Sequence, residues 1–407
     1  MTEPSPHVAH TSIQSHNHKW GLALALTQGQ SIKTDTVGHE CGGTAGMQDY
    51  HRRVERLREL LGAHDLDAMI ITQPENRRYL SGFTGTDATL FISSDAAVLI
   101  TDFRFTEQAS REAPQFRVVE AIPDLLASEL SRVARDEGAA RVGFESSHVS
   151  FADHQEWEES ATDHQLVPVQ GLVEGLRAIK DEEELDLIRR AAAIGDGAMM
   201  HVRQILRPGM TEREVAWEIE TYMRTHGAEA VSFDLIVASG ADGAMAHATV
   251  SDREIQKGEP VVFDLGARVE GYCSDLTRTL ILGEPDERFQ EIYYLVHDAQ
   301  LAALAGIKPG ITGREADALA RDVIKQGGYG ERFGHGLGHS LGLAVHEDPR
   351  MGRQSTAVLQ AGHTLTVEPG IYITGWGGVR IEDLVVITEN GVEVLSKAGK
   401  GPTVPVL

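Results

Sequence analysis

The chain has 407 residues, of which 41% are hydrophobic, 24% charged and 6% aromatic, as is typical of an ordinary soluble protein long enough for two or three domains. Its formal net charge of −24 argues against a general nucleic-acid binder, because such proteins neutralise phosphates with lysine and arginine, and against binding to an anionic membrane surface. Transmembrane proteins and disulfide-framed secreted domains are also excluded, since no apolar run approaches ~20 residues and the cysteines, Cys41 and Cys273, lie far apart.

Residues 1–46 are polar and show no sustained periodicity. The segment lacks the basic-then-apolar layout of a secretory signal, so we expect a cytoplasmic protein. It contains several histidines, and a histidine-rich tail can bind metal. Because so little of the segment is apolar, we instead predict a disordered extension, with Met47 as a candidate true start of the chain.

Residues 47–176 are expected to form a first α/β domain. Apolar residues at helical spacing indicate one helix face: Val54, Leu57, Leu60 and Leu61. A buried strand is predicted at residues 68–72 (AMIIT), and TLFISS, AVLITDF and RVGFE are predicted as further strands, with a helix near residues 121–137. This alternation of strands and helices is typical of an α/β domain.

Residues 177–401 contain an internal repeat. LRPGMTEREVA (206–216) and IKPGITGREAD (307–317) each place Pro-Gly at the end of one helix and a capping box at the start of the next: Thr211 with Glu214, and Thr312 with Glu315. The similarity resumes after the helices, where KGEPVVFDLG matches AGHTLTVEPG and CSDLTRTLIL matches RIEDLVVIT. Convergent capping could explain the first similarity alone, but it does not explain the matching carboxylates. We therefore interpret the region as a duplicated α/β half-domain.

The repeat aligns four carboxylates that lie in strand-like segments: Asp264 with Glu368, and Asp275 with Glu382. A hairpin turn centred near Val269 and Glu270 would place the two first-half acids opposite each other, and folding about Gly375 would do the same in the second half. Opposed residues on paired strands have Cβ atoms ~5 Å apart and point to the same face. Each hairpin is therefore expected to deliver a carboxylate pair to one face.

Carboxylates that converge inside a sheet repel one another at a cost of several kcal/mol unless they are protonated or bound to cations. The segment FGHGLGHSLGLAVHEDPR, residues 333–350, adds the imidazole of His339. Four carboxylates and one imidazole suit two divalent ions bridged by carboxylate. We interpret the glycines of this segment as positions where the backbone approaches the metals and the substrate. For the remaining histidines, a role near a reacting carbonyl and a merely structural role both stay open.

These stretches carry a family resemblance. AMAHATVSDREIQKGEPVVFDLGARVEGYCSDLTRT, FGHGLGHSLGLAVHEDPR and TVEPGIYITGWGGVRIEDLVVIT resemble the catalytic domain of the Xaa-Pro peptidases, the group of aminopeptidase P, prolidase and methionine aminopeptidase. NRRYLSGFTGTDATLFISSDAAVLITDFRFTEQA resembles the creatinase-type N-terminal domain, which favours the proline-directed branch. The resemblance implies an α/β (α+β) fold, in which a pita-bread domain with two duplicated halves follows a smaller creatinase-type domain. Residues 1–46 have no counterpart, and Ala246 stands where the family often has proline.

The resemblance also implies the roles of individual residues. The metal ligands fall on Asp264, Asp275, His339, Glu368 and Glu382. The implied catalytic residues are Glu368, as the acid/base, with His247 and His346 at the scissile carbonyl and the leaving group. The implied substrate-binding residues are His335, Arg350 and Arg380. The implied cofactor is a pair of divalent ions, with manganese preferred and cobalt, zinc or iron(II) as alternatives.

The activity implied by the resemblance is hydrolysis of the Xaa-Pro bond at the N-terminus of peptides or dipeptides, with a hydroxide that bridges the metals as nucleophile. The expected partners are a proline-containing peptide and a second copy of the chain, and neither nucleic acid nor membrane. Two other classes stay open: a metal-free, creatinase-like amidinohydrolase and a non-catalytic pita-bread binding protein. The complete ligand set weighs against both. Arg350 does not separate prolidase from aminopeptidase P, because related aminopeptidases carry the same arginine.

Overall fold

The computed structural model of the protein describes residues 45–404. The predicted extension, residues 1–46, lies outside the described residues except for its last two positions, which belong to the first helix. Within residues 45–404, no helix is both long and apolar enough to cross a membrane.

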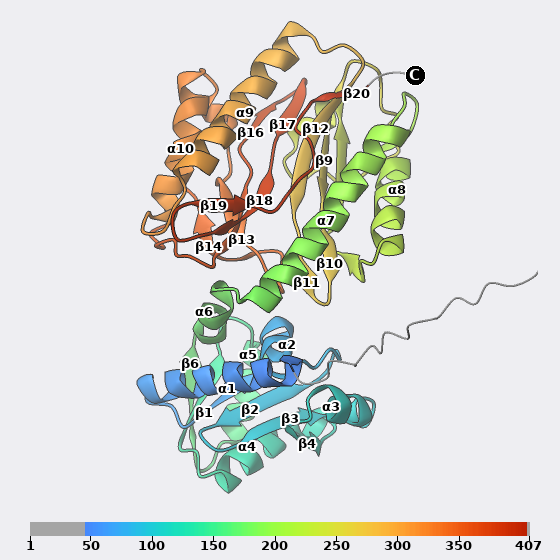
Figure 1. Cartoon of the computed structure of the whole chain (residues 1–407). Coiled ribbons are helices and arrows are strands. Elements are labelled where there is room, and N and C mark those ends of the chain that lie inside the picture. The colour runs from blue at the N-terminus through green and yellow to red at the C-terminus, as the bar shows by residue number, and fades with distance from the viewer. Residues whose placement is uncertain (1–44, 405–407) are drawn as a thin grey trace, which may run out of the picture. The chain divides into compact units, whose positions relative to one another are not determined.

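The first part of the described chain forms a six-stranded mixed sheet (Figure 1). In spatial order its strands are β4 (Arg117–Glu120), β3 (Ala97–Thr101), β2 (Thr89–Ser93), β1 (Ala68–Ile71), β5 (Arg141–Glu145) and β6 (Gln165–Val169). The helices are α1 (Ala45–Ala63), α2 (Pro74–Ser81), α3 (Thr106–Glu112), η1 (Pro123–Leu125), α4 (Leu126–Asp136), α5 (Phe151–Ser160) and α6 (Leu172–Ala178). The predicted strands and helices of this region are therefore present.

Alternate residues of β1 point into two different cores, as the period of a strand requires. Met69 and Ile71 share one core cluster with Leu57 of α1. Ile70 belongs to a second cluster, with Leu130 of α4. All four residues of β1 are buried, because helices cover both faces of the sheet. The prediction of a buried strand is confirmed.

Two further sheets form the centre of the second part of the chain. One contains β20 (Thr403–Val404), β12 (Leu276–Leu282), β9 (Pro260–Leu265) and β8 (Ile236–Ser239), and the other β14 (Glu347–Met351), β13 (Gly338–Ser340), β15 (Thr364–Val367), β18 (Asp383–Ile387) and β19 (Val392–Val394). Smaller groups are β11 (Tyr272–Cys273), β10 (Ala267–Val269) and β7 (Ala230–Val231), and the pair β16 (Gly370–Ile373) and β17 (Gly377–Arg380).

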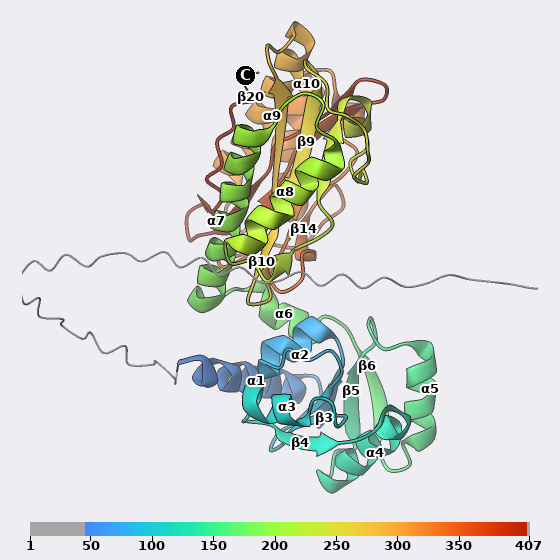
Figure 2. The same ribbon diagram turned by 90° about the vertical axis from the view of Figure 1, so that its right-hand side faces the viewer.

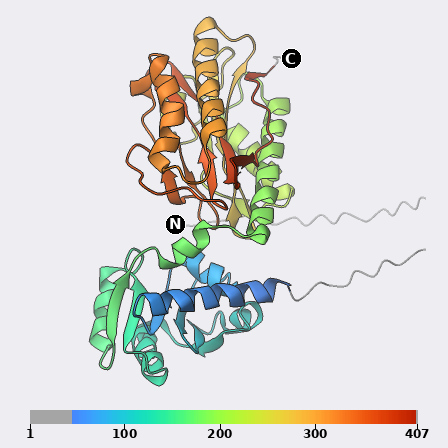
Figure 3. The ribbon, with the colours of Figure 1, turned by 60° about the vertical axis from the view of Figure 1, so that its left-hand side comes forward.

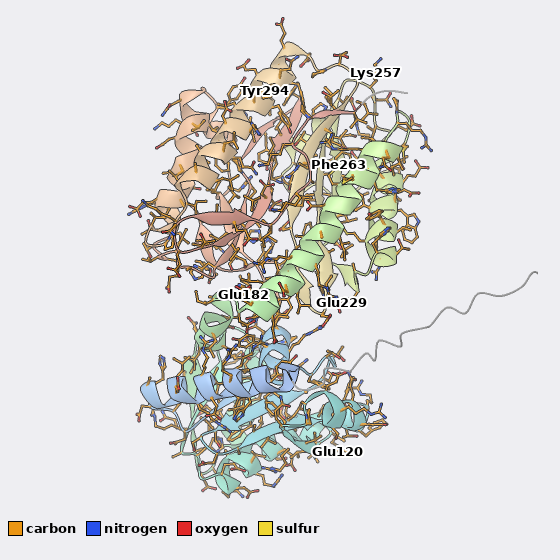
Figure 4. All side chains as sticks on the ribbon, viewed as in Figure 1. Glu120, Glu182, Glu229, Lys257, Phe263 and Tyr294 are labelled. Carbon is orange, nitrogen blue, oxygen red and sulfur yellow. The ribbon has the colours of Figure 1, made fainter. Side chains whose placement is uncertain are left out.

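Two pairs of helices flank these strands. The first pair is α7 (Glu182–Ile205) and α8 (Glu212–Thr225), followed by η2 (Gly240–Ala244), and the second is α9 (Glu287–Gly306) and α10 (Gly313–Gln326), followed by η3 (Gly330–Arg332). Figures 1 and 2 show α7 beside α8 on one side of the strands, and Figure 3 shows α9 beside α10 on the other. In Figure 4, Glu182 stands where α7 begins, in the acidic first turn that the helix dipole favours.

The two halves repeat each other in local structure. Helices α8 and α10 both begin with the predicted capping box, led by Thr211 and by Thr312. The same two threonines form equivalent isolated bridges, to Glu254 and to Val358. Each half also has its own core: one cluster joins α7 and α8 to β8, β9 and β12, and another joins α9 and α10 to β15 and β18. These matches support the interpretation of a duplicated half-domain.

The predicted register of the first hairpin is wrong by two residues. Asp264 is paired with Thr277 rather than with Asp275. The central turn residues are Glu270 and Gly271, both with positive φ (47° and 86°), whereas the prediction centred the turn one residue earlier. A two-residue hairpin loop with positive φ at both positions matches the strand twist, and it favours glycine over a β-branched residue such as valine. Asp264 and Asp275 nevertheless keep the same face, because a shift of two preserves the alternation.

The second hairpin has the predicted register. Val367 pairs with Asp383 in one ladder, and Gly370 pairs with Arg380 in the next. The same register carried between these ladders sets Glu368 opposite Glu382. Folding about Gly375 is therefore confirmed.

Two glycines of residues 334–342, Gly336 and Gly338, allow close packing of backbone segments. A Cβ on Gly338 would lie 1.9 Å from the carbonyl oxygen of Thr366, and one on Gly336 would lie 2.6 Å from that of Met351. The interpretation that these glycines admit metals and substrate to the backbone is therefore replaced at these two positions, where the close neighbour is the protein's own backbone.

We expect Gly338→Ala to destabilise the protein by about 1–3 kcal/mol, because β13 must move away from β15 to admit the methyl group. The control is Gly334→Ala in the same segment, where a Cβ would meet no atom within 4 Å, and it should leave stability unchanged. Urea unfolding of both variants measures the difference. Equal midpoints would show that close packing at Gly338 is not a constraint.

Candidate metal centre

Three carboxylates lie within reach of a single ion. Asp264 on β9, Asp275 directly before β12 and Glu382 directly before β18 offer oxygens that all lie within 4.8 Å of one another. Glu368 directly follows β15, and its backbone N–H donates to the carbonyl of Leu337 at 2.9 Å. The structure thus brings the predicted carboxylates together, two from each half.

His339 on β13 faces both halves of this cluster. Its Nε2 lies 3.7 Å from Oδ2 of Asp275 and 3.4 Å from Oε1 of Glu368. The other ring nitrogen, Nδ1, is 3.0 Å from the carbonyl oxygen of Ser340. Because a carbonyl can only accept, Nδ1 carries the proton and Nε2 presents a lone pair to the carboxylates. Metal-binding histidines are commonly oriented in this way.

Thr277 of β12 holds the second-half residues in place. Its hydroxyl donates to Oε2 of Glu382 at 2.7 Å and accepts from Nε of Arg380 at 2.9 Å. Its carbonyl accepts from the backbone N–H of Glu382 at 3.1 Å. Arg380 in turn donates through Nη2 to Oδ2 of Asp264 at 2.7 Å. One strand of the first half and one hairpin of the second are thus joined at the carboxylates.

Thr366 of β15 supports Glu368 with its side-chain hydroxyl, as Thr277 supports Glu382, although the repeat does not align these two threonines. The hydroxyl of Thr366 donates to Oε1 of Glu368 at 2.9 Å and accepts from the backbone N–H of His339 at 3.0 Å. Sequence reasoning missed both supporting threonines, although each lies two residues from a predicted acid. Side chains two apart on a strand share a face, so this period was the available signal.

Burial and mutual repulsion shift the proton affinities of the acids. Burial, followed by the charges of Glu382, Asp264 and Glu368, holds the pKa of Asp275 well above its ordinary value. Burial, followed by the charges of Glu368 and Asp264, raises the pKa of Glu382 well above its ordinary value, and burial raises the pKa of Glu368 to about 7. Burial lowers the pKa of His339 to about 4, so its imidazole is neutral near pH 7. A cation would relieve the repulsion among the carboxylates.

The cluster lies in a cavity of about 940 Å³. All other predicted site residues line the same cavity: His247, His335, His346, Arg350 and Arg380. His247 follows η2 and is exposed, as is His346, whose ring centre is 4.4 Å from that of His339. Arg350 on β14 has a side chain that is 66% exposed and is paired in register with His339. The structure therefore gathers the predicted residues around one space.

A hydrogen-bonded chain forms part of the cavity wall. Nη1 of Arg380 donates to the hydroxyl of Tyr372 at 2.8 Å, and that hydroxyl lies 2.8 Å from Nε2 of His335. Nδ1 of His335 donates to the carbonyl of Gly336 at 2.7 Å, so Nε2 accepts from the tyrosine. Both ring nitrogens of His335 are thus occupied. Tyr372 was not anticipated from the sequence, which gave no signal for it beyond its strand-like setting.

The carboxylates and the imidazole of this cluster are suitable ligands for divalent metal ions. Oδ1 of Asp264 is buried, and among the described residues no group donates a hydrogen bond to it. An orphaned carboxylate oxygen carries a large desolvation cost that a cation would offset. Carboxylate oxygens with a neutral imidazole form a ligand set for manganese, zinc, iron(II) or cobalt. Asp264, Asp275, His339, Glu368 and Glu382 are the residues that would hold the ions.

Comparisons with known proteins agree with this geometry. The family model described as Creatinase/Prolidase N-terminal domain matches residues 53–179, and that of Metallopeptidase family M24 matches residues 186–389. The uncharacterized peptidase YqhT of Bacillus subtilis (strain 168) is 45% identical over 348 residues, covering 86% of this chain and 98% of that protein.

Two solved structures are similar throughout their length. The Xaa-Pro dipeptidase from Bacillus anthracis has 43% sequence identity and a TM-score of 0.84, covering 88% of this chain and 100% of that one. The X-Pro aminopeptidase from Thermotoga maritima MSB8 has 37% identity and a TM-score of 0.81, covering 87% and 99%. The predicted fold class, a pita-bread domain after a creatinase-type domain, is confirmed, as are the resemblance to the Xaa-Pro peptidases and the expectation of a metallopeptidase. The chain belongs to metallopeptidase family M24.

Proposed function

We propose that the protein hydrolyses the Xaa-Pro bond at the N-terminus of peptides, using two divalent metal ions. The observation that carries the proposal is the convergence of Asp264, Asp275 and Glu382 within 4.8 Å, with His339 in reach of the same cluster. The names of the two solved relatives, an Xaa-Pro dipeptidase and an X-Pro aminopeptidase, support the choice of bond.

The metal contributes the activation of water. Divalent ions held by Asp264, Asp275, His339, Glu368 and Glu382 would lower the pKa of bound water and polarise the substrate carbonyl. We propose manganese, with cobalt, zinc or iron(II) tolerated, because these ligands accept all four and availability then decides.

Glu368 is the proposed acid/base. Its side chain is 17% exposed, compared with 8% for Asp275, so it is the more accessible of the two to water in the cavity. A carboxylate there can take a proton from the attacking water and deliver it to the leaving nitrogen. Glu368 is held for this task by the hydroxyl of Thr366.

The remaining residues are proposed to bind the peptide. His247 donates to the scissile carbonyl and His346 assists at the leaving nitrogen, while His335, Arg350 and Arg380 shape the substrate site; all five line the cavity. In an Xaa-Pro bond, the nitrogen of proline carries no hydrogen. Sites built to bind a peptide N–H therefore discriminate against such a bond, which gives a reason for a dedicated enzyme.

The alternatives are less well supported. A metal-free, creatinase-like enzyme or a binding protein does not require an acid cluster with an orphaned oxygen on Asp264. A homodimer and a cytoplasmic location, both expected from the sequence, remain predictions.

Replacing Asp264 tests the metal centre. We expect Asp264→Asn to lose bound metal and to lower kcat/KM by about a thousandfold, equivalent to about 4 kcal/mol, because the amide cannot neutralise a cation. Metal analysis and turnover of Ala-Pro-Ala measure the two effects. The matched control is Asp298→Asn on α9, where the side chain is 69% exposed, and it should behave as the unmodified protein. Full metal-dependent activity in Asp264→Asn would refute the assignment.

A second cavity bears on peptide length. It has a volume of about 980 Å³ and shares His335, Gly336, Arg350 and Gly352 with the metal cavity. We propose that it receives the part of the peptide beyond the proline, so that substrates longer than a dipeptide are accepted.

With manganese supplied, we expect cleavage of Ala-Pro-Ala as well as Ala-Pro, and little cleavage of Met-Ala-Ser. Chromatography of the products separates the three outcomes. Cleavage of Ala-Pro alone would contradict the proposed role of the second cavity, and cleavage of Met-Ala-Ser alone would contradict the proline specificity.

A further inference from the structure

A single loop joins the metal ligand His339 to His346. The loop connects β13 to β14, and Ser340 is paired with Glu347 at its base. His339 directly precedes Ser340 and lies just outside this base, whereas His346 directly precedes Glu347 and lies inside the loop. The strand register shifts between His339 and Ser340. Their ring centres are 4.4 Å apart. Whatever fixes the Ser340–Glu347 pair therefore fixes the separation of the two histidines.

The ammonium group of Lys180 fastens this base. Its Nζ donates to Oγ of Ser340 at 3.1 Å and to Oε2 of Glu347 at 3.0 Å, and the Lys180 side chain is only 1% exposed. Lys180 lies between α6 and α7, and its backbone N–H donates to the carbonyl of Gly362 at 3.0 Å. A Cβ on Gly342 would lie 3.0 Å from both Cε of Lys180 and the carboxylate of Glu347, so the loop fits closely around the pair.

Arg177 of α6 links this network to the N-terminal domain. Its Nη2 donates to Oε1 of Glu347, and its Nη1 donates to Oδ1 of Asn76 on α2 at 2.7 Å. Glu347 also accepts from the backbone N–H of Ala344 in the loop at 3.0 Å. The side chains of Arg177 and Glu347 are only 3% and 7% exposed, so both charges of this pair are buried.

Stability alone is a weak reason for this arrangement. Removing charged groups from water costs several kcal/mol for each ion, and well-packed apolar residues often stabilise as much or more. Buried polar networks can instead specify one arrangement of the chain. Here the arrangement specified includes the ring of His339, because Nδ1 of that ring donates to the carbonyl of the same Ser340 whose hydroxyl binds Lys180.

We propose that Lys180 is a positioning residue, which through Ser340 and Glu347 sets the orientation of His339 and its distance from His346. The proposal rests on the proposed function for the role of His346, but not for the orientation of His339 toward the carboxylates. Through Arg177 and Asn76, the N-terminal domain takes part in the same positioning.

Lys180→Met is the sharpest variant, because it keeps the length of the side chain and leaves Arg177 and Glu347 as a balanced pair. We expect the affinity for Mn²⁺ to fall about ten- to a hundredfold, as for other groups that orient a metal ligand. We expect kcat for Ala-Pro to fall by a similar factor with KM changed less. Chelator competition measures the Mn²⁺ affinity independently of turnover, so it remains informative if Ala-Pro is not the substrate.

Two further variants separate positioning from lost stability. Val133 lies on α4 in the N-terminal domain, where its side chain is fully buried in the core. Val133→Ala removes methyl groups there and should lower the Tm without changing Mn²⁺ affinity or kcat. Ser340→Ala removes the hydroxyl but keeps the carbonyl that binds His339, and should lower Mn²⁺ affinity in the same direction as Lys180→Met, by a smaller factor.

The outcomes are distinct. Reduced Mn²⁺ affinity in Lys180→Met, with a Tm no lower than that of Val133→Ala, supports the proposal. Mn²⁺ affinity equal to that of the unmodified protein in Lys180→Met overturns it. If Lys180→Met does not fold, Ser340→Ala decides in the same way. If Lys180→Met binds Mn²⁺ as tightly as the unmodified protein does, and the unmodified protein cleaves no prolyl peptide, both this proposal and the proposed function are contradicted.

Discussion

Repulsion among four carboxylates, two of them buried and two half-buried, is the constraint on which the C-terminal part of this protein depends. Left alone, Asp264, Asp275, Glu368 and Glu382 would move apart or take up protons, and burial with repulsion indeed raises the pKa of Asp275 and Glu382 well above their ordinary values. The fold resists the first outcome by fixing the backbone behind each acid. A bound cation would prevent the carboxylates from taking up protons, so the geometry of the site and the binding of metal depend on each other.

The backbone is fixed mainly along β12. Thr277 bonds the side chain and the backbone of Glu382, and Thr279 exchanges hydrogen bonds with the backbone of Arg380. Between them, Arg278 is 1% exposed and forms an ion pair with Asp383 at 2.8 Å. Three successive residues of the first half therefore bind the second half. The Arg278–Asp383 pair is held away from water, so removing either partner would leave an uncompensated buried charge.

Much of this could be predicted from the sequence because the signals are local or repeated. Leu57 and Ile70 follow helical and strand periods, Thr211 and Thr312 mark helix starts, and the internal repeat aligns the four acids in pairs. The register of the first hairpin does not follow from the spacing of its acids, because its turn is set by positive φ at Glu270 and Gly271.

Other features could not be found in this way. Lys180 and Glu347 are 167 residues apart, and no local period links a lysine before one helix to an acid at the start of a distant strand. The chain from Arg380 through Tyr372 to His335 depends likewise on which side chains happen to meet across the cavity wall. Long-range polar contacts of this kind follow from tertiary packing, which the pattern of apolar residues only outlines.

The separate cores of the two halves have a consequence for how the protein would hold metal. Asp264 and Asp275 belong to the first half, and His339, Glu368 and Glu382 to the second, so neither half alone owns a complete coordination sphere. The complete set of proposed ligands therefore exists only when the two halves are docked. Bound ions would then stabilise the interface between the two halves, and the metal concentration in the cell would set the size of this stabilisation.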